Sequence, residues 1–481
     1  MKRPTWLEYL TMNAYYVGLG YLWNSLHLFV LLVMLPVMIG AARQGSALGI
    51  LRTVGLVIAI VVMPAAGALS DRLTSRWGRR RPFMIAGTAL DLVFLAGIAW
   101  SFGQPLTAAG IAMPSWFPLT TNADFWLLLF LAYLGLQFAS NIANGPIQGL
   151  IPDLVPEEHR GVASGIKAFI EIAILVIAAI ITGQLLGRPD WSIVFASQVV
   201  IGVTALFLIV TLAINVFGIH ERPISAAEVP SRTVGEAVRR SFAISRARDP
   251  DYLWLLVSRL FILSGIGIVS DFATFYFKDV VLAGQANAEH LAPQLQADLL
   301  TIAGIMIVLV TIPAGILSDR WGRKPFSAIG GLVGILGAVF LLFARYRPLF
   351  AIGPLVVTDL LLDGILIGIG IGLFNSTNWA WATDLVPARE AARYLGISNL
   401  ATGGSQILAV IGGFVLDLAN AQTPGTGYNV LFSIGAIYFA LGVIVLPKIR
   451  ETRGQKTEDG RPMAEVSVFR PPSSVQDLED Q

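Results

Sequence analysis

Residues 67–82 read Gly-Ala-Leu-Ser-Asp-Arg-Leu-Thr-Ser-Arg-Trp-Gly-Arg-Arg-Arg-Pro and separate two long apolar runs. A shorter copy, residues 315–325, reads Gly-Ile-Leu-Ser-Asp-Arg-Trp-Gly-Arg-Lys-Pro and also lies between apolar runs. In each copy one helix would end before the Asp and another would begin at the Pro, which suits a tight turn between two membrane helices. The basic cluster would hold this turn on the cytoplasmic side. Two copies of one turn predict a chain made of two related halves.

The composition is that of a membrane protein. Of the 481 residues 55% are hydrophobic and 13% are charged, whereas about 25% of an ordinary soluble domain is charged. The 48 glycines suit closely packed membrane helices. The chain has no Cys and its four His lack ligand spacing, so we expect no metal and no cofactor. No nucleophile–base motif or phosphate loop is visible, so we do not expect an enzyme, and the net charge of +2 gives no reason to expect nucleic acid.

The apolar runs predict an all-α membrane protein with twelve spanning helices, because about 20 mainly apolar residues cross a bilayer. We expect these helices at residues 9–38, 47–70, 83–103, 124–150, 163–186, 192–218, 252–279, 296–317, 326–346, 356–382, 396–419 and 427–447. The predicted domains are a six-helix bundle at 1–218, an Arg-rich cytoplasmic linker at 219–251, a second six-helix bundle at 252–447, and a polar tail at 448–481. We expect the tail to be disordered and cytoplasmic.

The positions of Lys and Arg predict the orientation. With both termini inside, about 25 of the 33 basic residues fall on the cytoplasmic side. The long outer loops expected at 104–123 and 283–298 contain no Lys or Arg. We therefore expect a multi-pass protein of the cytoplasmic membrane, with the lipid bilayer as its surroundings, and we expect it to be a monomer.

Both copies of the turn resemble motif A of the major facilitator superfamily, which lies between helices 2 and 3 and between helices 8 and 9. The first copy carries a four-residue insert, and in this form it looks like the sucrose/proton symporters and their animal and bacterial relatives. The resemblance implies two six-helix bundles, each with inverted three-helix repeats, and a midplane cavity between them. It also implies transport of a small solute by alternating access with proton symport.

A second repeat supports two halves and suggests gates. Asp153-Leu154-Val155-Pro156 follows the fourth expected helix, and Asp384-Leu385-Val386-Pro387 follows the tenth. We expect Asp153 near Arg79 to Arg81 and Asp384 near Arg323, in pairs that form when the cytoplasmic side is closed and part when it opens. The alternative is a solubilising charge in a loop. The predicted gating residues are Asp71, Arg72, Arg79, Arg80, Arg81, Asp153, Arg259, Asp319, Arg320, Arg323 and Asp384.

Charged residues inside the expected helices are candidates for ion coupling, because each costs at least ~2.5 kcal/mol at a helix centre. Lys167 and Glu171 are spaced i, i+4 and share a face. Glu171 is either a coupling carboxyl or half of a static ion pair. Asp363 and Asp271 are further coupling candidates, and Asp271 is expected near an outer gate. The coupled ion would be a proton or, as an alternative, sodium.

The remaining charged residues receive structural interpretations. Arg52 lies near the outer end of the second helix, where its side chain can snorkel to the interface. Asp417 lies in a similar place at the end of the eleventh helix. Asp91 is expected to bond to a neighbouring helix, Asp359 to be interfacial, and Arg259 to serve a cytoplasmic gate.

Uncharged polar residues suggest the solute. Amides that bond hydroxyls, with aromatic rings against C–H faces, suit a polyhydroxylated compound such as a sugar or glycoside. The predicted substrate-binding residues are Asn24, Gln137, Asn141, Asn144, Gln148, Asn375, Asn378, Trp379 and Asn399. The alternative for each is an interhelical hydrogen bond worth about 1 kcal/mol.

The fourth helix departs from the pattern of the sucrose symporters. In that branch this helix carries an Asp and, eleven residues later, an Arg, on either side of an Asn and a Gly-Pro. Here Asn141 and Gly145-Pro146 match, but Gln137 and Gln148 stand at the two charged positions. Either coupling has moved to Glu171 or another carboxyl, or the protein is a facilitator.

Two rival functions remain open. One is an exporter of amphipathic compounds by proton antiport, for which the fifth helix would be expected to carry a Gly-Pro pair. This helix has Gly183-Gln184 and no Pro. The other is a non-transporting sensor or assembly factor on the same fold, against which the intact turns and buried charges argue.

Overall fold

The computed structural model describes residues 5–102, 122–156, 159–219, 221, 235–236, 250–352, 355–385 and 391–450. Twelve helices in this part of the chain are long and apolar enough to cross a membrane. The predicted all-α membrane fold with twelve spans is therefore confirmed. Most of the expected linker, the loop at 104–123 and nearly all of the expected tail lie outside the described residues.

The first half contains six spans. They are α1 Trp6–Ser25 continued by a π-helical turn Leu26–Val30 and α2 Leu31–Ile39; α3 Gln44–Ser70; α4 Arg81–Ser101; α6 Asn122–Gln148 continued by α7 Leu150–Leu154; α8 Arg160–Leu186; and α9 Ile193–Gly218. A short 3-10 turn, Ala41–Arg43, joins α2 to α3.

The second half repeats this plan. Its elements are α11 Pro250–Tyr276 with a π-helical turn Phe277–Val281; α12 Ala288–Trp321; α13 Arg323–Leu341; strands β1 Pro348–Ile352 and β2 Leu355–Thr358; α14 Asp359–Asp384; α15 Ala391–Gln422; and α16 Thr426–Val445 with a 3-10 turn Leu446–Lys448. Gly322, with φ of 100°, makes the turn between α12 and α13, where a side chain would be strained.

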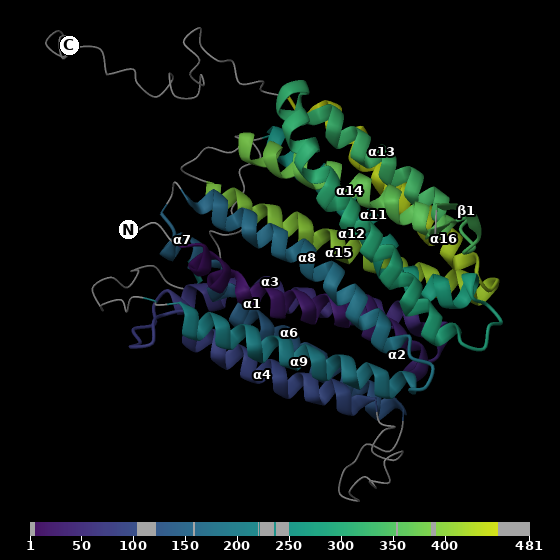
Figure 1. Ribbon diagram of the computed structural model, residues 1–481, viewed down its shortest axis with the longest axis horizontal. Coiled ribbons are helices and arrows are strands. Elements are labelled where there is room, and N and C mark those ends of the chain that lie inside the picture. Colours follow the sequence, from purple (N-terminus) through teal and green to yellow (C-terminus); the bar gives the residue numbers. More distant parts are fainter. Residues whose placement is uncertain are drawn as a thin grey trace, which may run out of the picture.

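The helices form two bundles that lie one above the other in Figure 1. In the first bundle α6 packs on α3 and α4, while α1 packs on α8 and α9. In the second, α14 packs on α12 and α13, while α11 packs on α15 and α16. The bundles meet mainly along two helix pairs, α3 with α15 and α8 with α12.

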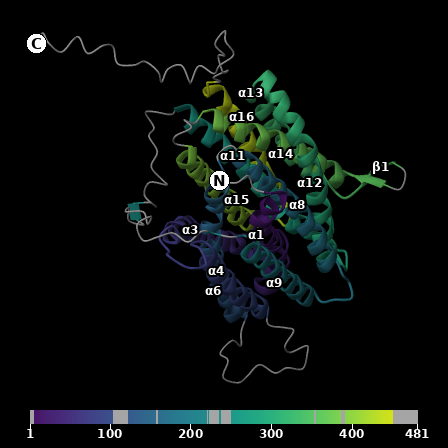
Figure 2. The ribbon, with the colours of Figure 1, turned by 60° about the vertical axis from the view of Figure 1, so that its left-hand side comes forward.

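The two ends of the molecule differ in their connections. We call the end that carries both basic turns, together with the C-terminal ends of α9 and α16, the basic end. We call the opposite end, with Gly40, Gly187 and β1–β2, the distal end. The strands project away from the helices at the distal end (Figure 2). By the positive-inside rule the basic end would be cytoplasmic.

Several helix boundaries differ from the sequence prediction, and two of the differences have a physical reason in the structure. The prediction of an outer loop at 283–298 is wrong from residue 288 onward, because α12 already begins at Ala288. Its polar first turns are helical because they dock on α8: His290 bonds the Leu186 carbonyl at 2.9 Å, and Gln294 donates to the Gly187 carbonyl at 3.1 Å. The expected tenth helix begins at Asp359 rather than 356, because β2 occupies Leu355–Thr358.

Candidate functional site

An ion pair joins the two bundles near the middle of the molecule. The Arg52 guanidinium of α3 contacts the Asp271 carboxylate of α11, and both side chains are less than a tenth exposed. The expectation that Arg52 snorkels to the interface is wrong, because its partner lies in the opposite bundle rather than in water. Asp271 is thus held at a contact between the halves.

A helix of one bundle is capped by a carboxylate of the other at the distal end. Asp417 on α15 accepts hydrogen bonds from the backbone N–H groups of Gly45, at 3.0 Å, and Ser46, at 2.7 Å. These are among the N–H groups at the N-terminus of α3 that have no intrahelical acceptor. Negative charge here also interacts favourably with the α3 dipole. Asp417 therefore has a defined role between the bundles that its sequence position did not suggest.

Further contacts close the same end. The Gln44 amide of α3 donates to the Asp279 carboxylate at 2.7 Å and to the Tyr428 hydroxyl at 3.1 Å. Backbone meets backbone where α3 crosses α15, since a Cβ placed on Gly45 would lie 2.5 Å from the Gly413 carbonyl oxygen. We call these contacts of Gln44, Gly45, Ser46 and Arg52 with the second bundle the distal seam.

A cavity of about 580 Å³ begins at the distal seam and extends toward the basic end. Its size falls within the range of small-molecule sites. The lining residues come from both bundles: Trp23, His27, Arg52, Leu56, Ala59, Ile60, Met63, Pro64, Tyr133, Gln137, Asn141, Asn144, Gln148, Thr402, Gly403 and Gln406. All four amides predicted on the fourth helix line this cavity.

The polar wall of the cavity is a connected chain of hydrogen bonds. His27 bonds the Tyr133 hydroxyl at 2.9 Å, and Gln137 donates to the same hydroxyl at 2.8 Å. Asn141 donates to the Gln137 backbone carbonyl at 2.7 Å. Gln148 lies at the basic end and is exposed, with its amide 3.4 Å from the Met63 sulfur. Along this wall the rings of His27 and Tyr133 are followed by the amides of Gln137 and Asn141.

Other predicted binding residues lie elsewhere. Asn24 donates to the Gly20 carbonyl of its own helix at 2.8 Å and does not line the cavity. Asn378 is fully buried and accepts from Arg259 at 2.8 Å. The side chain of Asn399 lies outside the described residues. Asn24 is thus bonded back to its own helix, whereas Asn378 is held by Arg259 and its amide nitrogen has no partner in the described chain; neither residue lines the cavity.

The second bundle presents two exposed residues that correspond to cavity residues of the first. Counted back from Asp384 and Asp153, Asn375 is equivalent to Asn144, and Trp379 to Gln148. Asn375 is exposed, and Trp379 is 45% exposed with the Arg259 guanidinium 5.6 Å from its ring centroid. The internal repeat thus gives α14 exposed residues equivalent to the cavity residues of α6, although Asn375 and Trp379 do not line the cavity.

Arg259 lies within the second bundle. Besides Asn378 it contacts the hydroxyl of Thr402, a cavity residue, at 3.4 Å. Within the described residues it forms no ion pair with a carboxylate. The expected cytoplasmic gate at Arg259 thus stays a prediction, with its side chain beside the cavity wall.

The first basic turn is held by a buried network. The Arg80 side chain is buried and contacts Asp71 at 2.6 Å, Asp153 at 3.1 Å and the Ser70 hydroxyl at 2.6 Å. Arg79 also contacts Asp153. All of these residues belong to one bundle, so their pairing does not by itself join the two halves.

The sequence analysis missed Glu221. Its carboxylate accepts from the backbone N–H groups of Arg80, at 2.9 Å, and Arg81, at 3.1 Å. It thereby caps the N-terminus of α4 from beyond the end of α9. Gly78, with φ of 91°, leaves room for the Glu221 side chain, because a Cβ there would lie 2.5 Å from the Glu221 Cβ.

The second basic turn repeats the core of this network in a more open form. Arg323 contacts Asp319, donates to Asp384 at 3.2 Å and to the Ser318 hydroxyl at 2.8 Å. The Asp319 and Asp384 side chains are 62% and 47% exposed. Arg72 and Arg320, also predicted to gate, form no side-chain ion pair or hydrogen bond in the described chain, and Arg320 is exposed.

The four predicted coupling residues occupy three different surroundings. Lys167 and Glu171 are bonded at 2.6 Å, but their side chains are 29% and 50% exposed, so Glu171 is not enclosed in a dry cavity. Asp363 is fully buried, and neither carboxylate oxygen has a partner in the described chain. Asp91 is likewise buried without partners. Asp271 alone among the predicted four reaches the cavity lining, through Arg52.

The comparison with protein families decides the identity of the chain. A family model described as MFS/sugar transport protein matches residues 19–393. The chain belongs to this family. The predicted membership of the major facilitator superfamily is thus confirmed, and this family member is a multi-pass membrane transporter.

Individual relatives agree with this family. Sucrose transport protein SUC4 of Arabidopsis thaliana is 23% identical over 440 residues, which cover 82% of each chain. Solute carrier family 45 member 4 of Mus musculus is 31% identical over 179 residues, which cover 35% of this chain but only 21% of that protein. A crystal structure of a D-xylose-proton symporter shares the fold, with a TM-score of 0.66, 17% identity, and coverage of 94% of this transporter and 100% of that chain.

Sequence reasoning missed Trp23, His27 and Tyr133 in the cavity. His27 was a lone histidine without ligand spacing, and the two aromatic residues resembled lipid-facing side chains. A signal was present in the spacing of Tyr133, Gln137 and Asn141, which follow each other at i, i+4 on one face. Arg52 and Asp271 carried no sequence signal of pairing, since they lie on helices of different halves.

Proposed function

We propose that this transporter moves a sugar or glycoside across the cytoplasmic membrane by alternating access with proton symport. The observation that carries the proposal is the cavity wall in which His27, Tyr133, Gln137 and Asn141 are connected. Amides and hydroxyls there can exchange hydrogen bonds with a polyhydroxylated solute, and rings can cover its C–H faces. The sucrose transport relative and the family description support the same solute class.

Alternating access would use the distal seam as one gate. Within the described residues, the polar side-chain contacts between the two bundles lie at the distal seam or at the α8–α12 contact beside it. We infer that this arrangement is the cytoplasm-facing state, with the basic end accessible to the solute. Opening the distal end would break these contacts while the basic turns close on each other.

Proton coupling would act through Asp271 and Arg52. In the closed seam, Arg52 neutralises Asp271. When the seam opens, Asp271 loses this partner, and its carboxylate binds a proton instead. Closing then brings Arg52 back, and the proton is released into the cavity that leads to the basic end. His27 and Tyr133 are the other titratable groups of the cavity lining, and neither carries the opposite charge to Arg52.

The test is uptake into proteoliposomes of a panel of labelled sugars and glycosides, with and without an inward proton gradient. We expect gradient-driven accumulation of at least one compound. Gln137→Leu should abolish its uptake, whereas Gln198→Leu, a matched change at an amide that donates to Ala99 on α4, should retain it. Flux of no sugar or glycoside in the panel would refute the proposed solute class.

A facilitator is the second candidate function. The uncharged Gln137 and Gln148, where the resembling symporters carry Asp and Arg, favour it. In the same assay a facilitator would only equilibrate the solute, whatever the proton gradient. With Asp271→Asn, a symporter should retain exchange of solute and lose accumulation, whereas a facilitator should be indifferent to the gradient both before and after the change.

A further inference from the structure

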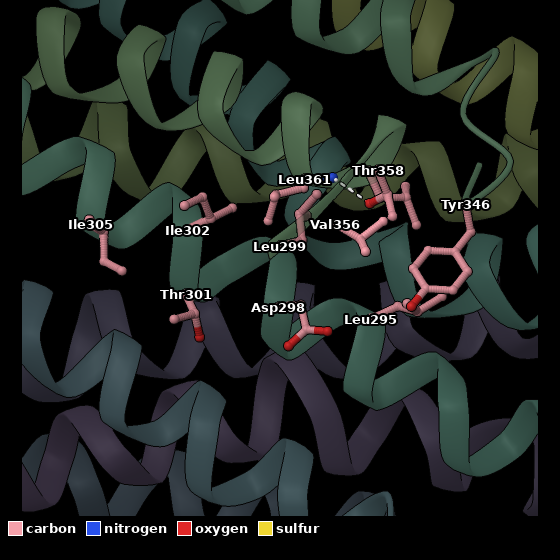
Figure 3. Close-up of a pocket in the computed structure, with 11 residues that line it drawn as sticks. Leu295, Asp298, Leu299, Thr301, Ile302, Ile305, Tyr346, Val356, Thr358 and Leu361 are labelled. Atoms are coloured by element: carbon pink, nitrogen blue, oxygen red, sulfur yellow. Dashed lines mark hydrogen bonds between the residues drawn. The ribbon is translucent and has the colours of Figure 1, made fainter. Parts of the chain in front are cut away.

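A second cavity of about 340 Å³ lies apart from the central one, at the distal end between α12 and α14 and beside the β1–β2 ribbon (Figure 3). It shares no lining residue with the central cavity. Leu295, Leu299, Ile302 and Ile305 of α12 form one side. We call it the lateral groove.

The lateral groove is amphipathic along the membrane normal. Tyr346 and Thr358 lie at its distal end, where α14 begins, Asp298 lies in its middle, and Ile302 and Ile305 lie toward the midplane (Figure 3). Below Ile305 the apolar side chains of Leu309, Ile312 and Ile316 continue on α12, each more than half exposed. The groove therefore leads from headgroup level into a stripe suited to an acyl chain.

Asp298 is the charged residue of the lateral groove. It is exposed, lies within a spanning helix, and has no ion-pair or hydrogen-bond partner in the described chain. Thr358 caps the first turn of α14 with its hydroxyl, 3.2 Å from the Leu361 amide, so the groove reaches the level where this helix enters the membrane. A carboxylate at this depth is costly unless a cation accompanies it.

The aromatic residue at the mouth of the groove, Tyr346, has a strained backbone conformation. Tyr346 has φ of 58°, and no other non-glycine residue in the described chain has a positive φ. A bulky residue in this conformation is unfavourable, and such strain is often retained at binding sites. Figure 3 shows the Tyr346 ring beside Leu295 and near Asp298. The adjacent Arg347 is exposed, and its backbone N–H is bonded to Asp359.

We propose that the lateral groove binds a phospholipid with a primary-amine headgroup, of the phosphatidylethanolamine class. Its ammonium would donate hydrogen bonds to Asp298, and one acyl chain would lie along Leu299, Ile302 and Ile305. Arg347, which follows Tyr346 in the chain and is exposed, would supply positive charge for the lipid phosphate. A choline headgroup lacks N–H donors, and a glycerol headgroup lacks the cation, so both should bind less well. This inference does not depend on the transported solute.

The experiment compares lipids retained by the purified full-length protein after exchange into equal mixtures of phosphatidylethanolamine, phosphatidylcholine and phosphatidylglycerol. Native mass spectrometry reports the bound lipids. We expect wild type to retain phosphatidylethanolamine at least threefold over either competitor. Asp298→Asn should reduce this ratio to near one, whereas Asp190→Asn, a change at another exposed acid of the distal end, should leave it unchanged.

A second variant tests the groove without removing its charge. Val356→Trp should fill the groove from β2 and lower phosphatidylethanolamine retention, because Val356 is 52% exposed and lines it. Equal retention of the three lipids by wild type would overturn the proposal. Preference for phosphatidylethanolamine that survives both Asp298→Asn and Val356→Trp would also overturn it, since the lipid would then bind elsewhere.

Discussion

The distal seam and the basic turns use the same chemistry for opposite purposes. At the distal seam, Arg52, Asp271 and Asp417 join one bundle to the other. At the basic end, Arg80 and Asp153 are paired within a single bundle. The comparison shows that the same kind of ion pair lies between the halves at one end and within one half at the other. Under the proposed alternation the pairs of the distal seam must break when that end opens, whereas the pairs within one bundle need not.

Removal of Arg80 should have the largest effect on the protein as a whole. Arg80→Ala removes the buried cation between Asp71 and Asp153 and leaves Asp153 to Arg79 alone. Because both carboxylates are partly exposed, the cost in stability should be about 3 kcal/mol, at the lower end for a broken buried pair. We expect a large fall in the thermal unfolding midpoint in detergent. Arg72→Ala, in the same turn but with no side-chain partner in the described chain, is the control and should change stability by less than about 1 kcal/mol. Equal effects of the two changes would show that the buried network does not hold the turn.

Changes at Arg52 should shift the equilibrium between the distal-closed and the distal-open state. Removing one partner of a buried pair costs about 2–5 kcal/mol, so Arg52→Gln should populate the distal-open state at least tenfold more. The chain has no Cys, so a single Val410→Cys in the α3–α15 contact reports opening by its alkylation rate. We expect the double variant, with Arg52→Gln and Asp271→Asn, to have an alkylation rate closer to that of wild type than the Arg52→Gln variant has. A double variant that labels faster than either single variant would contradict the pairing.

The cap on α3 should have a moderate effect. Asp417→Asn keeps an oxygen acceptor but removes the charge at the helix N-terminus, worth about 0.3–1 kcal/mol. Labelling of Val410→Cys should therefore rise about two- to fivefold, and more at low salt. Asp190→Asn serves as the control for an exposed acid at this end. Faster labelling in both variants would mean that surface charge, rather than the cap, is responsible.

Glu171 should have the smallest effect. Its pair with Lys167 is half exposed, and such pairs contribute about 0.2–0.5 kcal/mol. Glu171→Gln should change gradient-driven uptake by less than about twofold, whereas Asp271→Asn should abolish accumulation. If Glu171→Gln loses accumulation and retains exchange, coupling lies at Glu171 and the proposed role of Asp271 is wrong.

The sequence predicted what depends on local pattern. Apolar runs located all twelve spans, and the repeated turn placed Asp153 beside Arg79 and Asp384 beside Arg323 in space. The amide stripe from Gln137 to Gln148 lines the cavity because helical spacing alone puts these residues on one face. These features need only the chain's own periodicity and internal repeat.

The rest depends on how separate helices meet. Arg52 looked like an interfacial residue because a helix position gives depth but not the identity of the neighbouring helix. Its partner Asp271 follows more than two hundred residues later. The start of α12 was missed for the same reason, since its polar first turns are helical through contacts with Leu186 and Gly187. Asn24 was misassigned to the cavity because an amide in a helix often bonds to its own backbone, and Asn378 because its partner Arg259 lies on another helix.

The crossing of α3 and α15 at Gly45 and Gly413 has a consequence for any mutational survey of this protein. Neither residue has a side chain to delete, so alanine, which elsewhere removes atoms, here adds a methyl group between two backbones. In an alanine scan, a destabilised contact at this position would therefore result from an added methyl group that separates the backbones, and not from the loss of a side-chain interaction. A series of side chains of increasing size at Gly413 would separate the two backbones by increasing distances. Solute entry from the distal side, measured across this series, would show how much separation the proposed opening requires.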